Sequence, residues 1–168
     1  MKYSSAFIII FSFTALISNA QNLQSLDQQN GFGSFSFGDD VNDYKDDLKL
    51  DLTISLGQKE IKYYGYQGKE LKTVYALTSN QVNLGFENGK LFYLDIYFKK
   101  LGDGEFQELL KQFEQAYGTS TEIEPMDQGA VEAYNWIGSI VEMQVVRYDQ
   151  SAAEEERNMT VVTFNKKE

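Results

Sequence analysis

Residues 89–98 read GKLFYLDIYF, and this stretch decides the fold because its apolar residues alternate as they do in a β-strand. Successive side chains of a strand point to opposite faces of the sheet. The alternate positions that we expect to face the core are Phe92, Leu94, Ile96 and Phe98. The positions on the other face are Leu91, Tyr93, Asp95 and Tyr97. A row of tyrosines around a carboxylate is either a binding surface or simply the solvent-exposed face of a sheet.

The preceding residues Val82, Leu84 and Phe86 also alternate and predict the partner strand of a hairpin. A two-residue Asn88-Gly89 loop would place Phe86 opposite Leu91 and split the apolar residues between the two faces. A three-residue loop, Glu87 to Gly89, would place Leu84 opposite Phe92 and gather them on one face. We therefore predict the three-residue loop, with a positive φ at Gly89.

Period-two alternation extends through residues 51–99 and predicts an antiparallel meander. Its strands are expected over residues 52–56, 61–63, 71–77, 82–86 and 91–98. Residues 34–37 predict one further short strand near the start. We expect residues 159–164 to form the last strand.

Residues 103–117 form the clearest helical pattern in the chain, with Asp103 as a candidate N-cap and Gly118 suited to the C-terminal end. Its apolar stripe comprises Phe106, Leu109, Leu110, Phe113 and Tyr117. A sheet face must cover such a stripe, and we expect that face to be the Phe92 to Phe98 side. A second, short helix is predicted after Asp39, where Val41, Tyr44 and Leu48 recur every three or four residues.

Residues 133–148 predict a second hairpin around a Gly138-Ser139 turn. This register pairs Trp136 with Val141 and Tyr134 with Met143, which gathers the bulky residues on one face. The whole pattern predicts an α+β fold, in which one long and one short helix pack on one face of an antiparallel β-sheet of meander hairpins.

The first 20 residues have the features of a signal peptide: Lys2, an apolar run shorter than a membrane span, and the small residues Ser18 and Ala20 before the expected cut. We expect cleavage after Ala20, a flexible lead-in over residues 21–30 and a single α+β domain over residues 31–168. The predicted location is the periplasm or the extracellular space, with no membrane span left in the mature chain.

Composition excludes several classes of function. The chain has no cysteine and no histidine, so disulfides, Ser-His-Asp and Cys-His catalysis and the usual zinc ligand sets are excluded. The net charge is −10, and it becomes −11 when the segment bearing Lys2 is removed. Such acidity argues against a nucleic-acid partner and is compatible with a basic protein, a cation or a neutral glycan.

Tyrosines are the most suggestive candidates for binding. The residues that we expect to form a recognition surface are Tyr63, Tyr75, Tyr93, Asp95 and Tyr97. Tyrosine offers a large contact area at a low entropic cost and also stacks on sugars. The competing interpretation is that tyrosine is a good strand former whose hydroxyl tolerates water.

The acidic residues give weaker signals. The cluster from Asp39 to Asp51 lacks the glycine that a helix-loop-helix calcium site requires, so we interpret it as a solvated helix start and assign no metal. Asp95, Glu132 and Glu142 lie on predicted strands, but the expected registers bring no two of them together. We assign no catalytic residue and no cofactor.

The sequence thus predicts an exported, non-enzymatic binding domain that recognises a protein or a glycan through its tyrosine-rich sheet face. The alternative is a small glycan hydrolase that depends on carboxylates. A pair of carboxylates about 5 to 10 Å apart across a cleft would favour the hydrolase.

Three segments, FENGKLFYLDIYF (86–98), LLKQFEQAYG (109–118) and AYNWIGSIVEMQVVRY (133–148), together resemble small exported bacterial proteins of unassigned function. Their shared layout is a hairpin, a helix ending in Tyr-Gly and a Trp-bearing hairpin, and it covers about residues 82 to 148. The layout is also similar to that of periplasmic inhibitor and assembly-factor domains. This resemblance implies an arrangement of elements and carries over no functional residue.

Overall fold

The computed structural model describes residues 18–99, 101–126, 129–148 and 158–167. Its centre is an eight-stranded antiparallel sheet, as the alternating pattern predicted. In spatial order the strands are β3 (Leu48–Leu56), β4 (Lys59–Tyr66), β7 (Gln81–Glu87), β8 (Lys90–Lys99), β12 (Met159–Lys166), β11 (Val141–Tyr148), β10 (Ala130–Ile137) and β9 (Thr121–Ile123). The last strand, β12, therefore lies between the two predicted hairpins and joins them.

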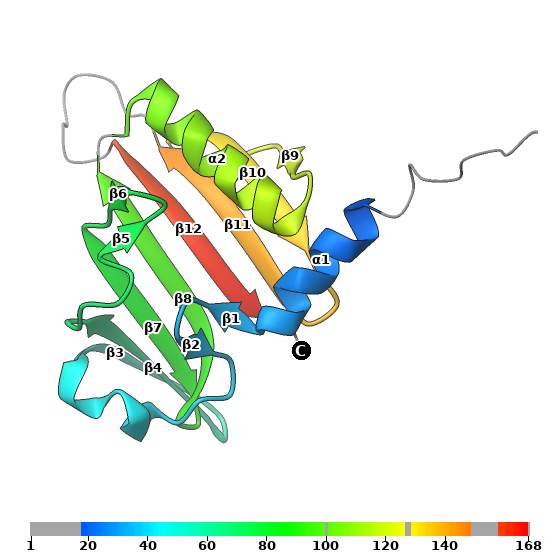
Figure 1. Cartoon of the computed structure of the whole chain (residues 1–168). Helices are drawn as coiled ribbons and strands as arrows, with labels where there is room; N and C mark the ends of the chain where they lie inside the picture. Colours follow the sequence, from blue (N-terminus) through cyan, green and yellow to red (C-terminus); the bar gives the residue numbers. More distant parts are fainter. Residues whose placement is uncertain (1–17, 100, 127–128, 149–157, 168) are drawn as a thin grey trace, which may run out of the picture.

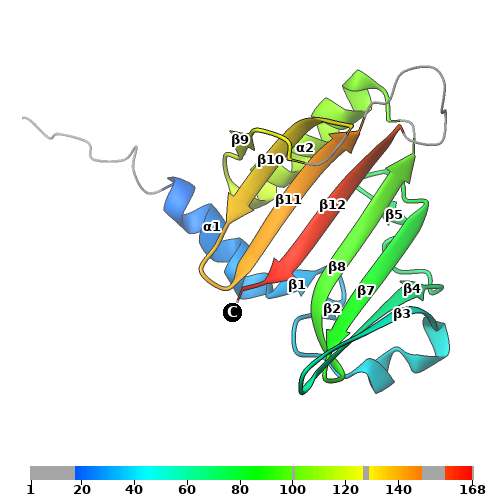
Figure 2. The same cartoon turned by 180° about the vertical axis from the view of Figure 1, so that it is seen from behind.

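Helices cover one face of this sheet, which we call the helix face (Figure 1). Two α-helices lie there, α1 (Ser18–Gln29) and α2 (Asp103–Tyr117). Two small hairpins lie on the same side: β1 (Gly31–Phe32) with β2 (Phe35–Ser36), and β5 (Thr73–Val74) with β6 (Leu77–Thr78). Figure 2 shows the opposite face, which we call the outer face, and none of the described elements crosses it.

The core lies between α2 and the sheet. The apolar stripe of α2 is buried as predicted, and it packs in one cluster with Leu94, Ile96 and Phe98 of β8. Gly118 ends the helix with a φ of 86°, which also matches the expectation. Asp103 is not the N-cap: Gly102 holds that position, and the Glu105 carboxylate accepts a hydrogen bond of 2.9 Å from its N–H.

The first hairpin does not have the predicted turn. Phe86 lies opposite Leu91, so the loop is the two-residue Asn88-Gly89 turn, with φ of 50° and 80° at the two residues. A β-bulge follows at once, because Gly85 pairs with Tyr93 and Phe92 is the extra residue. The bulge moves Leu91 to the core and Phe92 to the outer face, which reverses the faces that we expected for both.

The second hairpin is shifted from the predicted register by two residues. Trp136 pairs with Met143 and Tyr134 with Val145, and the turn is centred on Ser139 and Ile140. A shift of two keeps every side chain on its face. Trp136, Val141 and Met143 are therefore buried together, as the pattern required.

Residues 21–30 are not a flexible lead-in, because most of them belong to α1. Leu26 is fully buried against the core, and the Ser25 hydroxyl donates to the carbonyl of Ala116 at 2.7 Å. The Asp27 carboxylate accepts from the backbone N–H groups of Ser139, Ile140 and Val141 at 2.6, 2.8 and 3.0 Å. These contacts join α1 to α2 and to the second hairpin.

Three shorter segments also differ from the expectation. Residues 31–36 form a two-strand hairpin instead of one strand, and residues 41–47 form two 3₁₀ turns, η1 (Val41–Asp43) and η2 (Lys45–Asp47). Asp40, and not Asp39, caps the first of these turns. The strand expected over residues 71–77 is the hairpin β5–β6, so β4 pairs directly with β7.

Candidate functional site

The outer face brings together four of the five predicted site residues. Tyr93, Asp95 and Tyr97 point there from β8, and Tyr63 joins them from β4. Tyr75 does not: it lies between β5 and β6 with a φ of 48°, and its ring packs edge-on against Phe113 of α2. Tyr75 therefore belongs to the helix face.

Asp95 is the centre of this group. The residue is only 4% exposed although it lies on the face without helices, because the surrounding side chains enclose it. One carboxylate oxygen accepts hydrogen bonds from the Tyr93 hydroxyl and, at 2.9 Å, from the Tyr97 hydroxyl. The other oxygen accepts from the Thr163 hydroxyl of β12 at 2.6 Å. We call Tyr93, Asp95, Tyr97 and Thr163 the Asp95 cluster.

Burial raises the pKa of the Asp95 carboxyl, and the three hydroxyl donors, which favour its ionised form, offset only part of that rise. Burial also raises the pKa of Tyr93 and Tyr97, and the negative charge of Asp95 raises both further. Both hydroxyls therefore remain protonated donors at neutral pH. The cluster holds two aromatic rings in fixed orientations on the outer face.

A second aromatic group adjoins the Asp95 cluster. Tyr63 packs edge-on against both Tyr93 and Phe92, with ring centroids 5.7 and 6.3 Å apart. The side chains of all three residues surround Gly85, where a β-carbon would lie 2.9 Å from the β-carbon of Tyr93. The glycine and the bulge together allow the rings to gather over the sheet.

The outer face continues as an apolar surface toward the edge strand β3. Leu52 lies opposite Tyr63 and Ile54 opposite Ile61, and cross-strand partners share a face. Leu52 is 52% exposed and Ile54 is half-buried, so the outer face of β3 presents partly exposed aliphatic side chains next to the aromatic group. Exposed apolar area joined to fixed aromatic rings is typical of a contact surface.

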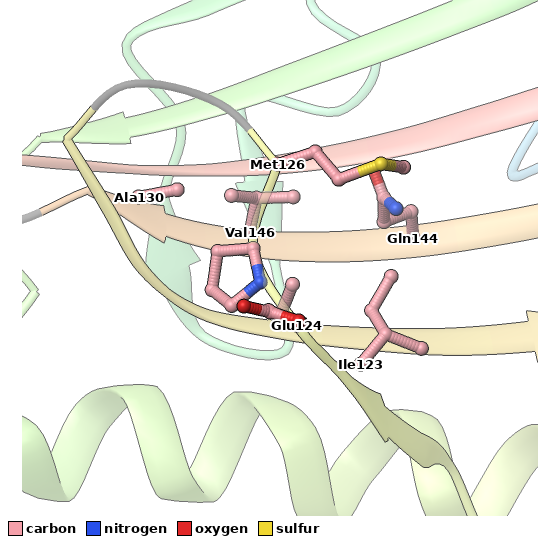
Figure 3. A pocket seen from close by; sticks show the side chains of 8 residues that line it. Ile123, Glu124, Met126, Ala130, Gln144 and Val146 are labelled. Carbon is pink, nitrogen blue, oxygen red and sulfur yellow. The ribbon is translucent and has the colours of Figure 1, made fainter.

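A small pocket of about 120 Å³ lies near the opposite edge of the sheet (Figure 3). The labelled side chains around it are Ile123, Glu124, Met126, Ala130, Gln144 and Val146. Glu124 is the only titratable side chain among the described residues that line it. The pocket therefore presents no pair of acids and no acid–base pair.

The carboxylates considered for catalysis have separate partners. Glu132 binds Arg147 at 3.1 Å on the helix face, where Arg147 also lies over the Phe106 ring. Glu142 accepts a long hydrogen bond of 3.4 Å from the Asn135 amide. Asp95 is bound by hydroxyls alone. Within the described ranges these three acids do not converge, so the geometry that favours a hydrolase is not found among them.

The acidic cluster near Asp39 has local structural roles. Asp40 accepts from the backbone N–H of Asn42 at 3.0 Å and pairs with Lys90 at 3.3 Å. Asp39 accepts from the Ser36 N–H at 2.9 Å and from the Tyr44 hydroxyl. In the part of the chain that the structure describes, no three acidic side chains are arranged to hold a metal ion.

Sequence reasoning missed three members of the outer face: Gly85, Phe92 and Thr163. A glycine within an alternating strand is a signal for a bulge, and Gly85 could have been read that way. Thr163 had no such signal, because its place depends on β12 pairing with β8.

Comparison with known protein families, curated proteins and solved structures finds no match to this chain. Among the described residues, no helix has the length and apolar character needed to cross a membrane. The site therefore has to be interpreted from its own geometry.

Proposed function

We propose that this chain is a non-enzymatic binding domain that receives a partner protein on its outer face. The observation that carries the proposal is the Asp95 cluster: a buried carboxylate holds the Tyr93 and Tyr97 rings in place on a face that none of the described helices covers. Rings that are already fixed lose little conformational entropy on binding, so they are good anchors for a partner.

A protein suits this face better than a glycan because the aromatic group continues into uncovered aliphatic side chains. Leu52 and Leu56 of β3 are 52% and 61% exposed, and they continue the outer face beyond the tyrosines of β4 and β8. Aromatic rings stack on sugars, but exposed leucines contribute to binding mainly when a partner's apolar side chains cover them.

The proposal can be tested with two matched variants of β3. Leu50 and Leu52 are 51% and 52% exposed, but Leu50 lies opposite Tyr64 on the helix face and Leu52 opposite Tyr63 on the outer face. The tagged protein is used to capture partners from the cell envelope fraction of the source organism. We expect a protein that is retained by wild type and by Leu50→Lys and is lost with Leu52→Lys.

Two outcomes would overturn the proposal. One is loss of the captured protein with Leu50→Lys but not with Leu52→Lys, which would place the contact on the helix face. The other is binding of wild type to a glycan array with no protein captured, which would replace the protein partner with a sugar. Circular dichroism of each variant confirms that it is folded before the comparison is made.

We further propose that the chain is exported, with cleavage after Ala20. The proposal is supported by the apolar run before Ser18-Asn19-Ala20. Such a cut would remove the first three residues of α1 and keep Leu23, Leu26 and Asp27, through which this helix packs. Intact-mass measurement should give a chain that begins at Gln21. Recovery of a chain that retains Met1 would contradict it.

A further inference from the structure

Strand β3 forms one edge of the eight-stranded sheet, and among the described strands it pairs with β4 alone (Figure 2). A strand at an edge presents a row of backbone N–H and C=O groups that can pair with another chain. The strand at the opposite edge, β9, has three residues, whereas β3 has nine. Of the two edges, β3 is therefore the one that can accept a further strand.

The hairpin turn identifies which backbone groups of β3 are directed to its free side. Leu56 lies opposite Lys59, so a two-residue loop joins β3 to β4. Residues that flank such a loop exchange both backbone hydrogen bonds, and bonded and non-bonded pairs alternate from there along the hairpin. The backbone of Ile54 therefore bonds to β4, as that of Leu56 does. Thr53 and Ser55 direct their N–H and C=O groups away from β4.

The hydrogen bonds of Glu60 support this assignment. Glu60 lies opposite Ser55 in the β3–β4 pairing. Its C=O accepts from the backbone N–H of Asn88 at 2.8 Å, and its N–H donates to the Asn88 side chain at 3.0 Å. Both backbone groups of Glu60 thus point away from β3, which is the arrangement of a non-bonded pair. The N–H and C=O of Ser55 therefore face the free side of the edge.

Only the first half of β3 has the features that usually keep edge strands from pairing. Lys49 and Asp51 place charges there, and Asp51 is also the extra residue of a β-bulge. Residues 52–56, with the sequence LTISL, contain no charge, no proline and no bulge. An apolar edge segment without such protection is a site where another strand can add.

The segment 52–56 is complementary to a second copy of itself. In an antiparallel pairing centred on Ile54, each Thr53 lies opposite Ser55 of the other copy, and each Leu52 lies opposite Leu56. Cross-strand partners share a face, so aliphatic side chains meet on the outer face and hydroxyl side chains on the helix face. Thr53 and Ser55 are also the residues with free backbone groups. Each Thr53–Ser55 pair therefore exchanges both of its backbone hydrogen bonds.

We propose that two copies of this chain pair through β3 in this register and form one continuous antiparallel sheet. The same segment of each copy makes the contact, so the association closes at a dimer. The two-fold axis is perpendicular to the sheet, and the outer faces of both copies lie on the same side. The dimer does not depend on a partner protein at the outer face, and either proposal can fail without the other.

Single cysteines test the register, because the chain has no cysteine of its own. Ile54→Cys places two thiols opposite each other in a non-bonded pair, where the α-carbons lie about 4.5 Å apart, within the range of a disulfide. Leu56→Cys, on the same face of the same strand, is the control, because the two thiols would be offset by roughly 13 Å. The purified mature protein is oxidised in air with copper phenanthroline. We expect at least fivefold more disulfide-linked dimer with Ile54→Cys than with Leu56→Cys.

Sedimentation velocity measures the same dimer without a crosslink. Wild type should associate reversibly between about 10 μM and 1 mM, because a small edge contact belongs to the weak class of interfaces. Thr53→Glu with Ser55→Glu sets carboxylates opposite carboxylates and should weaken association at least tenfold. Thr53→Glu with Ser55→Lys sets opposite charges across the contact and should associate at least as tightly as wild type. Lys62 and Glu60, their neighbours on β4, suit these two charges.

A further variant controls for repulsion between whole chains. Gln107→Glu with Gln115→Glu adds the same charge at exposed positions of α2 and should associate as wild type does. Circular dichroism confirms that each variant is folded. The proposal is overturned if wild type stays monomeric over this range, if Leu56→Cys crosslinks as efficiently as Ile54→Cys, or if the doubly acidic variant of β3 associates as wild type does. It is also overturned if the variant with opposite charges associates as weakly as the doubly acidic one.

Discussion

Gly85 of β7 lies directly opposite Tyr93 of β8, and its missing side chain is what allows three aromatic rings to gather on the outer face. A β-carbon at Gly85 would lie 2.9 Å from the β-carbon of Tyr93, 3.0 Å from a ring carbon of Tyr63 and 3.2 Å from one of Phe92. The aromatic group therefore depends on a glycine that sits beside a β-bulge.

Gly85→Ala should destabilise the protein by about 1–3 kcal/mol, the usual cost of forcing an extra methyl into a packed group. The matched control is Gly104→Ala in α2, where nothing lies within 4 Å of the added β-carbon. That variant should be neutral or stabilising by about 0.5–1 kcal/mol, because alanine favours a helix over glycine. Urea unfolding of the two variants measures the difference. Equal stabilities would show that the rings do not close over Gly85.

The Asn88-Gly89 turn gives a second prediction. Gly89 has a φ of 80°, so Gly89→Ala should cost on the order of 1 kcal/mol, because a β-carbon is disfavoured in this conformation. Asn88→Gly is the companion variant, because glycine also accepts a positive φ but loses the hydrogen bond from the Glu60 N–H to the Asn88 side chain. It should cost less than Gly89→Ala in the same unfolding assay. The reverse order would contradict the two-residue turn.

The carboxylate of Asp27 should make the stability of the fold depend on pH in the acidic range. Burial opposes its ionisation, but the N–H groups of Ile140, Val141 and Ser139, together with Lys167, lower its pKa below the ordinary 3.8. A lowered pKa stabilises the fold above about pH 4, and this contribution is lost as pH falls through the lowered value. Asp27→Asn should therefore cost about 1–3 kcal/mol at pH 7, from unsatisfied N–H groups, and less at pH 3.

Thermal unfolding of wild type and Asp27→Asn between pH 3 and pH 7 tests this dependence. Gln24→Asn, on an exposed position of the same helix, controls for the effect of asparagine in α1. A constant difference between Asp27→Asn and wild type across this range would contradict the role of the ionised carboxylate.

Asp95 should behave in the opposite way. Burial raises its pKa above 3.8, so the folded state binds a proton more readily than the unfolded state does. Its favourable contribution is complete below the unfolded pKa and is lost as pH rises through the raised value. Asp95→Asn removes this titration, so the stability of wild type relative to the variant should decline between pH 4 and pH 7. A relative stability that rises over this interval would contradict the raised pKa.

Alternation and helical periodicity predicted the parts of the fold in which one pattern continues without interruption. The stripe from Phe106 to Tyr117 has a single apolar side and packs as expected. The bulge at Phe92 was not predicted, because a period of two assumes that no residue is inserted. Periodicity also could not detect the two-residue shift at Trp136, because such a shift leaves every side chain on its original face.

Other elements depend on contacts that local sequence does not determine. The polar composition of residues 21–30 predicted no helix, but burial of Leu26 and the Asp27 contacts at the second hairpin stabilise one there. The alternation of side chains along a strand was enough to place Tyr93, Asp95 and Tyr97 on one face. Thr163, which completes the carboxylate's hydrogen bonds, comes from β12, and no local pattern places that strand beside β8.

The central claim, that a partner protein contacts the outer face, is tested most directly by site-specific photocrosslinking in the cell envelope. A photoreactive amino acid replaces Gln81, which is exposed and pairs with Tyr97 on the outer face, or Gln107, which is exposed on α2. The account predicts one defined protein crosslinked from position 81 and absent from position 107. Crosslinking of that protein from position 107 alone, or equally from both positions, would contradict it.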